Sequence, residues 1–277
     1  MKIVRKTNEL EILLDSINDS RKHIGLVLTM GNIHNGHISL VKEAKNNNEF
    51  VIASIFVNPT QFNSKNDYSS YTRTLDEDIE KLKSSKCDLL YLPSVNEIYP
   101  KGLIINKNVL KHRNILCDIH RPGHFDGVTT VVNTFFNIIN PKNSYFGEKD
   151  FQQMKIINEM VKLKKLNINI IALPSVRDCY GMSLSSRNSK FNQLQSEIFI
   201  SLAKKINLFV NTLKPISIEK KIDIFKKELS KIKINKIDYI EVRDEKNLEI
   251  TNDFASARLF VALYIDNIRI IDNFKLY

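Results

Sequence analysis

The sequence predicts an α/β protein, with a Rossmann-like parallel sheet that has helices on both faces and a smaller C-terminal α+β domain. In the first two thirds of the 277-residue chain, short apolar runs typical of doubly buried strands alternate with amphipathic segments. After Asn192 the pattern changes to two long helices followed by strands. We therefore expect a first domain over residues 1–176 and a second over 177–277.

Five apolar runs predict the strands of the parallel sheet. Each is short, is rich in Ile, Val, Leu or Phe, and is closed by a glycine turn or a proline. They cover 24–28, 50–57, 88–92, 144–146 and 168–173. With helices between them, they make the strand–helix–strand order of a doubly wound sheet.

Helices are predicted where apolar residues recur at helical spacing. One of them starts at Thr74 to Glu77, which has the Thr-x-x-Glu form of a capping box. The polar stretch 63–71 is expected to be a mobile loop. The expected helices cover 7–20, 38–44, 74–83, 131–139, 151–163, 193–213 and 217–231, and the tail strands 237–242, 258–265 and 267–271.

The turn from Thr29 to His37 joins the first strand to its helix, at the place where α/β proteins bind nucleotide phosphates. Gly31 and Gly36 let the backbone approach a ligand closely, because they have no Cβ. His34 and His37 lie three residues apart and can face the same side of the first helical turn, where the macrodipole favours anions. A triphosphate fits this turn better than zinc, which lacks further ligands nearby, but a purely structural turn stays open.

Two amides follow the second strand, in Asn58-Pro59-Thr60-Gln61. Ligands of open α/β sheets bind at this carboxyl edge, so Asn58 and Gln61 are candidates for substrate binding. A structural role for these amides, in which they satisfy loop backbone, is equally compatible with the sequence.

Three later turns carry charged or hydroxyl groups. The turn 121–128 opens a helix, and Gly147-Glu148-Lys149-Asp150 repeats the strand–turn–helix design of the histidine turn. The third, Gly181 to Asn188, places small hydroxyls beside Arg187, and these groups can donate to phosphate oxygens.

Composition limits the class of protein. No run of eighteen apolar residues predicts a membrane span, and the N-terminus lacks the features of a signal peptide. The three widely spaced cysteines are typical of reduced thiols, so we expect a cytoplasmic protein. The net charge of +10 comes mostly from scattered lysines, and the densest cluster (220–233) lies on one amphipathic helix, so we expect no nucleic-acid partner.

Several blocks together resemble a known family. The histidine turn and the late Ser-Ser-Arg loop are similar to the nucleotidyltransferase superfamily with its HxGH motif. The finer resemblance is to the pantoate–β-alanine ligase family, and its blocks span nearly the whole chain in the family's order. They are TMGNIHNGHISLV, SIFVNPTQF, YTRTLDEDIEKL, RPGHFDGVTTVV, YFGEKDFQQ, LSSRN, DYIEVRD and ARLFVA.

The resemblance implies an ATP- and Mg²⁺-dependent ligase that works through a pantoyl-adenylate, is a homodimer, and has an active site covered by the smaller domain. It implies that pantoate is held by Gln61 and Gln153, with Gln61 near β-alanine. His34, His37, Lys149 and Arg187 would be the catalytic cations and donors. The implied ATP-binding residues are Met30, Gly31, Asn32, Ile33, His34, Asn35, Gly36, His37, Gly147, Glu148, Lys149, Asp150, Val176, Leu184, Ser185, Ser186 and Arg187. The sequence does not indicate which residues bind the metal.

The chain departs from the family pattern at Thr72, at Cys179-Tyr180 and at Ser183, which leaves loop mobility open but removes no charged group. Two other functions fit the sequence less well. An RNA-binding synthetase-like protein would need more chain after the Ser-Ser-Arg loop. A plain adenylyltransferase would lack glutamines suited to a small hydroxy acid.

Overall fold

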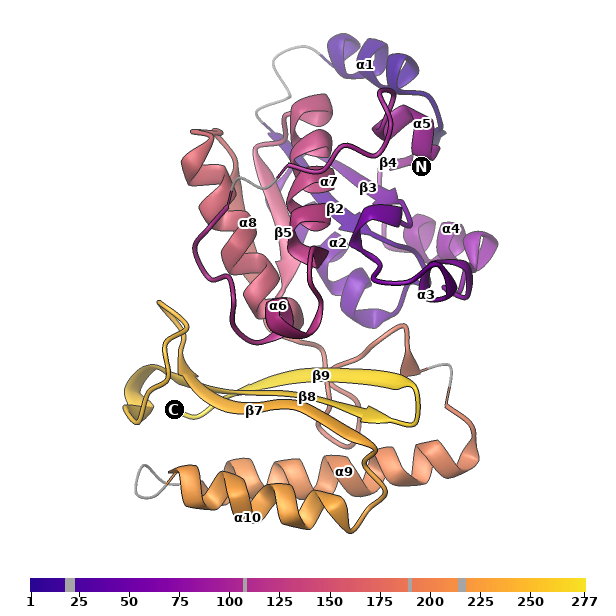
Figure 1. Cartoon of the computed structure of the whole chain (residues 1–277). Coiled ribbons are helices and arrows are strands. Elements are labelled where there is room, and N and C mark those ends of the chain that lie inside the picture. The colour runs from indigo at the N-terminus through magenta and orange to yellow at the C-terminus, as the bar shows by residue number, and fades with distance from the viewer. Residues whose placement is uncertain (18–22, 107–108, 189–190, 214–217) are drawn as a thin grey trace. The chain divides into compact units, whose positions relative to one another are not determined.

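The computed structural model describes residues 1–17, 23–106, 109–188, 191–213 and 218–277 (Figure 1). The chain divides into two compact units. Unit 1 comprises Met1–Arg113 and Arg121–Pro174, and unit 2 comprises Asn114–His120 and Ser175–Tyr277. The expected domains, 1–176 and 177–277, stay a prediction, and each unit is described by itself.

Unit 1 contains the predicted parallel sheet, so the α/β class is confirmed. Its six strands lie in the order β1-β4-β3-β2-β5-β6. They are β1 (Lys2–Val4), β2 (Ile24–Thr29), β3 (Phe50–Ile55), β4 (Leu89–Tyr91), β5 (Asn143–Gly147) and β6 (Asn169–Leu173). The sequence did not predict β1, because three residues are too few for a pattern; its pairing with β4, from Lys2 opposite Leu89 to Val4 opposite Tyr91, defines it.

Helices cover both faces of this sheet. Leu90 of β4 belongs to a buried cluster with Val41 of α2 and Leu82 of α4. Because successive residues of a strand point to opposite faces, Tyr91 faces the other side, where its ring lies 5.9 Å from that of Phe135 in α7. The helices of unit 1 are α1 (Thr7–Ser16), α2 (Asn35–Asn47), α3 (Lys65–Ser69), α4 (Leu75–Ser84), α5 (Val95–Ile98), α7 (His124–Ile139) and α8 (Phe151–Leu163), with 3₁₀ turns η2 (Pro59–Gln61) and η3 (Glu148–Asp150).

Three local predictions were wrong. Thr74 makes no capping bond to α4; its hydroxyl donates to Asp78 Oδ1 at 3.2 Å. The stretch 63–71 is not a plain loop, because it contains α3, capped by Ser64. Most of the turn 121–128 belongs to α7, which begins at His124. Parts of two predicted helices, 18–20 and 217, lie outside the described residues.

The sheet reverses its strand order at β2. Successive strands β3 and β4 lie on one side of β2, whereas β5 and β6 lie on the other (Figure 1). Val27 of β2 pairs with Ala53 of β3 and with Tyr145 of β5. The carboxyl ends of β2 and β5 are therefore neighbours at the topological switch point, where open α/β sheets bind ligands.

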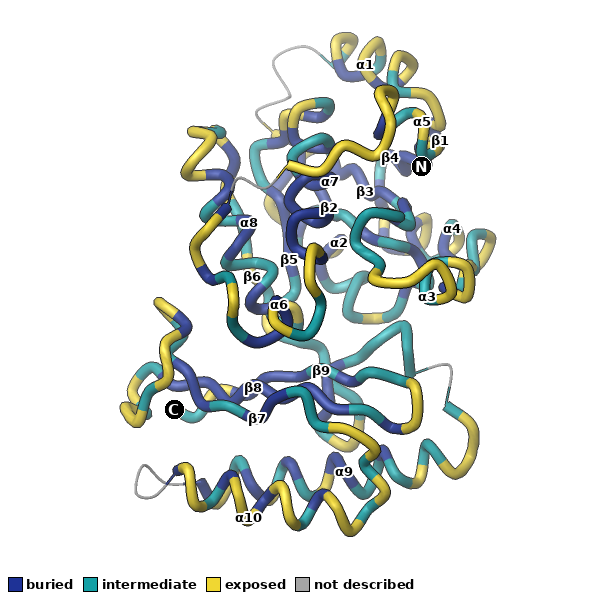
Figure 2. Tube along the Cα trace, viewed as in Figure 1, coloured by how far each residue is buried: buried dark blue, intermediate teal, exposed yellow. Residues whose placement is uncertain are grey.

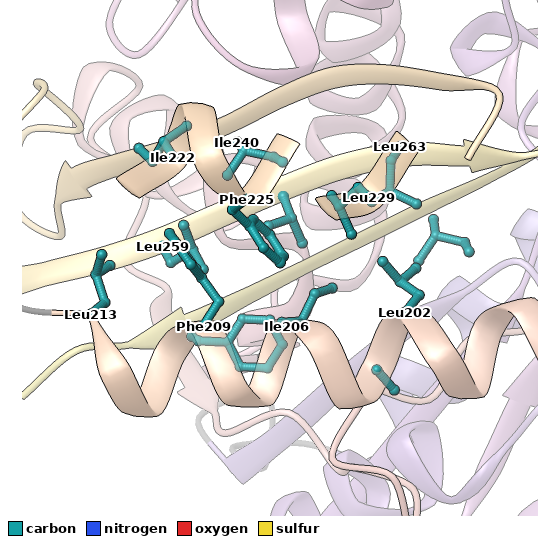
Figure 3. Close-up of a cluster of buried hydrophobic side chains, with 14 of the residues drawn as sticks. Leu202, Ile206, Phe209, Leu213, Ile222, Phe225, Leu229, Ile240, Leu259 and Leu263 are labelled. Carbon is teal, nitrogen blue, oxygen red and sulfur yellow. The ribbon is translucent and has the colours of Figure 1, made fainter. Parts of the chain in front are cut away.

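Unit 2 is an antiparallel sheet with helices packed on it, as the tail pattern predicts. Its elements are β7 (Lys236–Asp244), β8 (Ala257–Ile265), β9 (Ile268–Lys275), α9 (Gln193–Thr212), α10 (Ile218–Ser230) and α6 (Cys117–His120). Figure 3 shows the core, in which Ile206 and Phe209 of α9 and Phe225 of α10 lie beside Leu259 of β8. Buried and exposed positions alternate along α9 and α10 in Figure 2, as expected for helices with one face on a sheet.

None of the helices in the described ranges has the length and apolar character needed to cross a bilayer.

Candidate active site

The turn that follows β2 is held by its own first residue. The hydroxyl of Thr29 donates to Ser54 O of the neighbouring strand at 2.8 Å and accepts from Gly31 N at 3.1 Å. Gly31 (φ +81°) and Asn32 (φ +49°) then take left-handed conformations in succession. Glycine adopts a left-handed conformation at no steric cost, which accounts for the glycine at position 31.

Asp78 of α4 closes this turn, and the sequence did not identify it as a site residue. Its carboxylate is buried and accepts from Asn32 N at 2.8 Å and from Ile33 N at 2.7 Å. One turn further along α4, Lys81 Nζ donates to Ile33 O at 2.9 Å. One signal was available: Asp78 falls on the apolar face of its helix, four residues before Leu82, where a carboxylate needs a partner.

His34 and His37 form a reciprocal cap at the start of α2. Nδ1 of His34 accepts from Gly36 N at 3.1 Å, and Nδ1 of His37 accepts from His34 N at 3.4 Å. The two ring centroids lie 4.1 Å apart. A Cβ on Gly36 would come within 2.9 Å of the His34 ring, which explains the glycine between them. The predicted common orientation of the histidines is confirmed.

The surroundings of the two histidines disfavour the protonated, charged form of each ring. Burial, followed by the charges of Lys149 and Lys81, lowers the pKa of His34 from its ordinary 6.5 to about 4, although Asp150 opposes this. Burial, His34 and Lys149 hold the pKa of His37 well below its ordinary value. Because each Nδ1 accepts a backbone N–H, the single proton of each neutral ring lies on Nε2. Each histidine is thus an uncharged Nε2–H donor.

The second predicted turn follows β5. Gly147 ends the strand, and Glu148–Asp150 form η3 before α8 begins. The charge of Lys149 acts on the pKa of both histidines, so the structure brings the ammonium group close to the two rings. A half-buried lysine beside two neutral donors makes a positive site at the switch point, suited to an anion.

Asn58 is buried, and its side chain is hydrogen-bonded to protein groups on both sides. Its Nδ2 donates to Gln61 Oε1 at 3.1 Å and to Gly127 O at 3.2 Å. Its Oδ1 accepts from Tyr99 Oη at 2.7 Å and from Thr60 Oγ1 at 2.9 Å. Both amide hydrogens are therefore used inside the protein, which favours the structural alternative for Asn58 over direct substrate binding.

Gln61 is oriented from two sides. Its side-chain oxygen accepts from Asn58, and its amide nitrogen donates to Met30 Sδ at 3.0 Å, which leaves one amide hydrogen of Gln61 for another acceptor. Its backbone oxygen accepts from His124 Nδ1 at 2.8 Å and from Arg121 Nη2 at 3.2 Å. The sequence did not identify His124 and Arg121 individually, although both lie in the turn 121–128.

Gln153 lies in the first turn of α8 and is half-buried. Within the described chain its side chain forms no hydrogen bond, and α8 has no side-chain cap, so a helix-capping role for Gln153 is contradicted. Its neighbour Gln152 is buried, and Nε2 donates to His112 O at 3.0 Å. The amide of Gln153 is the one with capacity left for a ligand.

The remaining candidates lie in unit 2. Leu184 N donates to Val176 O at 2.9 Å, so these two are neighbours, and Arg187 N donates to Ser185 Oγ at 3.2 Å. The loop between them is tied to the unit 2 sheet, because Arg177 Nη1 bonds Asp272 Oδ2 at 3.0 Å and Ser183 N bonds the same oxygen at 2.8 Å. Ser183 itself is buried, and its hydroxyl has no hydrogen-bond partner.

Two departures from the family pattern sit in this loop, and the structure accounts for the backbone there. Asp178 Oδ1 accepts from Tyr180 N at 2.9 Å and from Met182 N at 3.0 Å, and Asn207 Nδ2 donates to Tyr180 O at 2.6 Å. The tight turn is thus held by Asp178 and Asn207. Nothing in the structure explains Thr72.

The chain is similar to one family of known proteins over nearly its whole length. Residues 2–275 match the family model described as pantoate–β-alanine ligase. The chain is 39% identical to the pantothenate synthetases of Thermosipho africanus and Clostridium botulinum, over 99% of each chain. Among solved structures, the Thermus thermophilus pantothenate synthetase superposes with a TM-score of 0.88 at 31% identity, covering 100% of both chains. A Francisella tularensis pantoate–β-alanine ligase, complexed with βγ-ATP and β-alanine, gives 0.87 at 38% identity, covering 100% of this chain and 98% of that one.

Proposed function

The chain belongs to the pantoate–β-alanine ligase family, and we propose how its own residues carry out the reaction of that family. The enzyme condenses (R)-pantoate with β-alanine to form pantothenate through a pantoyl-adenylate. The carboxylate of pantoate attacks the α-phosphorus of ATP, and diphosphate leaves. The amine of β-alanine then attacks the acyl carbon of the adenylate, and AMP leaves with the electron pair of the broken acyl–oxygen bond.

We propose that His34, His37 and Lys149 act on the phosphates of ATP. The observation that carries this assignment is the meeting of two neutral Nε2–H donors and one ammonium group at the switch point of the sheet. Charge accumulates on the phosphate oxygens as the carboxylate attacks, and fixed donors aimed at them lower the barrier. No enzyme nucleophile is needed, because the substrate carboxylate attacks, so the protein contributes positioning and charge stabilisation.

The rest of the two turns is proposed to surround the nucleotide. Met30 to His37 and Gly147 to Asp150 supply the walls of this part of the site in unit 1. Val176 and Leu184 to Arg187 of unit 2 are proposed to bind ATP because the LSSRN segment resembles the ATP-binding motif of the family. Arg187 would be the cation of that group, since its guanidinium stays charged at all working pH values.

We propose that Gln61 and Gln153 bind pantoate and that Asn58 positions Gln61. Pantoate presents a carboxylate together with hydroxyls, and a carboxamide can donate to the first and accept from the second. The second amide hydrogen of Gln61 and the unbonded side chain of Gln153 in the described structure fit these tasks.

Mg²⁺ is proposed to enter with the nucleotide. The described residues contain no group of three or more His, Cys, Asp or Glu side chains arranged to hold a metal ion. Mg²⁺ commonly keeps several waters and binds through substrate phosphates with one or two carboxylates. Asp150, whose charge already reaches His34, is the carboxylate best placed to contribute. Its contribution would be to neutralise phosphate charge.

We also propose a homodimer in the cytoplasm. The three cysteines form no disulfide, and Cys87 and Cys117 are buried, in keeping with a reducing compartment. Sedimentation of the purified protein at micromolar concentration tests the homodimer, and a single monomeric species would contradict it.

The reaction is tested by following AMP release while pantoate and β-alanine are omitted in turn. We expect sustained AMP formation only when ATP, pantoate and β-alanine are all present, and its loss when EDTA removes the metal. AMP release that is indifferent to omission of both pantoate and β-alanine would contradict the ligase reaction.

A further inference from the structure

Helix α4 holds the histidine turn from a distance of more than forty residues in sequence. Asp78, which is only 1% exposed, accepts from Asn32 N and Ile33 N, and Lys81 donates to the carbonyl oxygen of Ile33. The hydroxyl of Thr74 adds a third bond to the Asp78 carboxylate at 3.2 Å. These contacts bind both the donors and the acceptor of one peptide segment to a single rigid helix.

The backbone of the turn has the form of an anion-binding nest. In this turn the successive N–H groups of Asn32 and Ile33 converge on one carboxylate. Such pairs of N–H groups bind phosphates in many proteins. Here the anion that they bind is Asp78, and further along the turn Gly36 N is bonded to His34 Nδ1. These three amides are engaged within the protein.

Building on the proposed role of the histidines toward ATP, we propose that Asp78 is a positioning residue for adenylation. Its carboxylate fills the nest of the histidine turn, so the triphosphate is met by the Nε2–H groups of His34 and His37 and not by the Asn32 and Ile33 amides. Asp78 thereby sets the positions of the two rings through the backbone that carries them.

The positions of the two histidine rings affect the rate because the rings are proposed to donate hydrogen bonds to the phosphates in the transition state. A hydrogen-bond donor lowers the barrier only to the extent that it binds the transition state more tightly than it binds the substrate. Replacing the Asp78 carboxylate with a carboxamide would leave one of the two amides facing an NH2 group instead of an acceptor, so that this amide could attract a phosphate of ATP. The nucleotide would then bind in a shifted position, and a displacement of about 1 Å is enough to cost roughly 10²-fold in rate.

The test compares Asp78→Asn with Asp76→Asn. Both residues lie in the first turns of α4, but Asp76 is exposed and Asp78 is buried, so the control makes the same chemical change on the same helix. The first readout is the NMR signature of the His34 and His37 ring protons and nitrogens without nucleotide. The second is kcat and KM for AMP formation with all three substrates.

We expect Asp78→Asn to shift the ring signals of both histidines and to lower kcat roughly 10²-fold, with the KM for pantoate unchanged. Asp76→Asn should match the wild type in both readouts. A folded Asp78→Asn protein with unchanged ring signals and unchanged kcat would overturn the proposal. Because the ring signals are read without ATP, they test positioning even if the histidines prove to have no role in catalysis.

Two further variants complete the experiment. If Asp78→Asn does not fold, Lys81→Met removes the second anchor of the turn from a half-exposed side chain; we expect shifted ring signals and a roughly tenfold lower kcat, the effect of losing one charge-assisted bond. Unchanged signals and rate in Lys81→Met would then overturn the proposal. His37→Ala separates the two hypotheses: a wild-type rate in that variant would refute the proposed role of His37 toward ATP, whatever Asp78→Asn does to the ring signals.

Discussion

Acid should destabilise this protein through the histidine turn, and His34→Gln should remove part of that sensitivity. The pKa of His34 is lowered to about 4 in the folded protein, whereas an unfolded chain titrates at the ordinary 6.5. Between these two values the unfolded state binds the proton and the folded state does not. The stabilisation by neutral His34 is therefore complete above about pH 6.5 and is lost progressively as the pH falls toward 4.

The size of the effect follows from the two pKa values. At pH 5 the preferential protonation of the unfolded state costs about 2 kcal/mol of unfolding free energy, and at pH 7.5 it costs almost nothing. The pKa of His37 is lowered partly by His34, so relief at His37 adds to the difference in the same direction. Loss of the His34 cap lowers the stability of the variant at both pH values and cancels from the comparison.

The assay is reversible urea unfolding followed by circular dichroism at pH 7.5 and pH 5.0, without nucleotide. Between the two conditions, wild type should lose about 2 kcal/mol more than His34→Gln. The matched control is His23→Gln, because the side chain of His23 is 53% exposed; this variant should lose as much as wild type. Parallel losses in wild type and His34→Gln would refute the pKa of His34 and, with it, the neutral-donor description of the turn.

Three other substitutions address the remaining parts of the site. Lys149→Ala should lower the adenylation rate roughly 10²–10³-fold with little change in melting temperature, since it removes one donor to developing phosphate charge; a wild-type rate in the folded variant would exclude the assignment. Gln153→Ala should raise the KM for pantoate and leave that for ATP and the stability unchanged, and the reverse pattern of KM values would place the residue in the nucleotide subsite. Arg177→Ala should cost about 3 kcal/mol in urea unfolding, because it leaves the buried Asp272 carboxylate without its partner; a loss below 1 kcal/mol would show that Asp272 is otherwise satisfied.

Much of the fold could be predicted from local patterns. Local sequence alone predicts the strands β2, β3, β5 and β6 from their apolar runs, and the helices α8 and α9 from the spacing of their apolar residues. The start of α7 was placed seven residues too late, since Arg121-Pro122-Gly123 and the polar residues after it resemble a turn. Burial against the sheet outweighs that local preference.

The capping box at Thr74 failed for a different reason. Ser/Thr-x-x-Glu is a local pattern, and it predicts a bond between the threonine and the backbone of its own helix. The hydroxyl of Thr74 instead donates to Asp78, whose carboxylate is held in place by the histidine turn. The hydroxyl of Thr74 thus bonds to the side chain of Asp78, four residues away. Contacts with another part of the chain hold that carboxylate in place.

By itself the sequence determined the class of fold and the family. A strand, a glycine turn and a helix recur in an order that permits one doubly wound sheet, and the HxGH turn falls at its carboxyl edge. The chemistry of that turn was decided only by tertiary structure. Burial and the charge of Lys149 lower the pKa values of His34 and His37, and Asp78 fills the nest that the turn forms. Charge state and hydrogen-bond partners depend on groups that are distant in sequence and close in space, whereas local structure depends on neighbours along the chain.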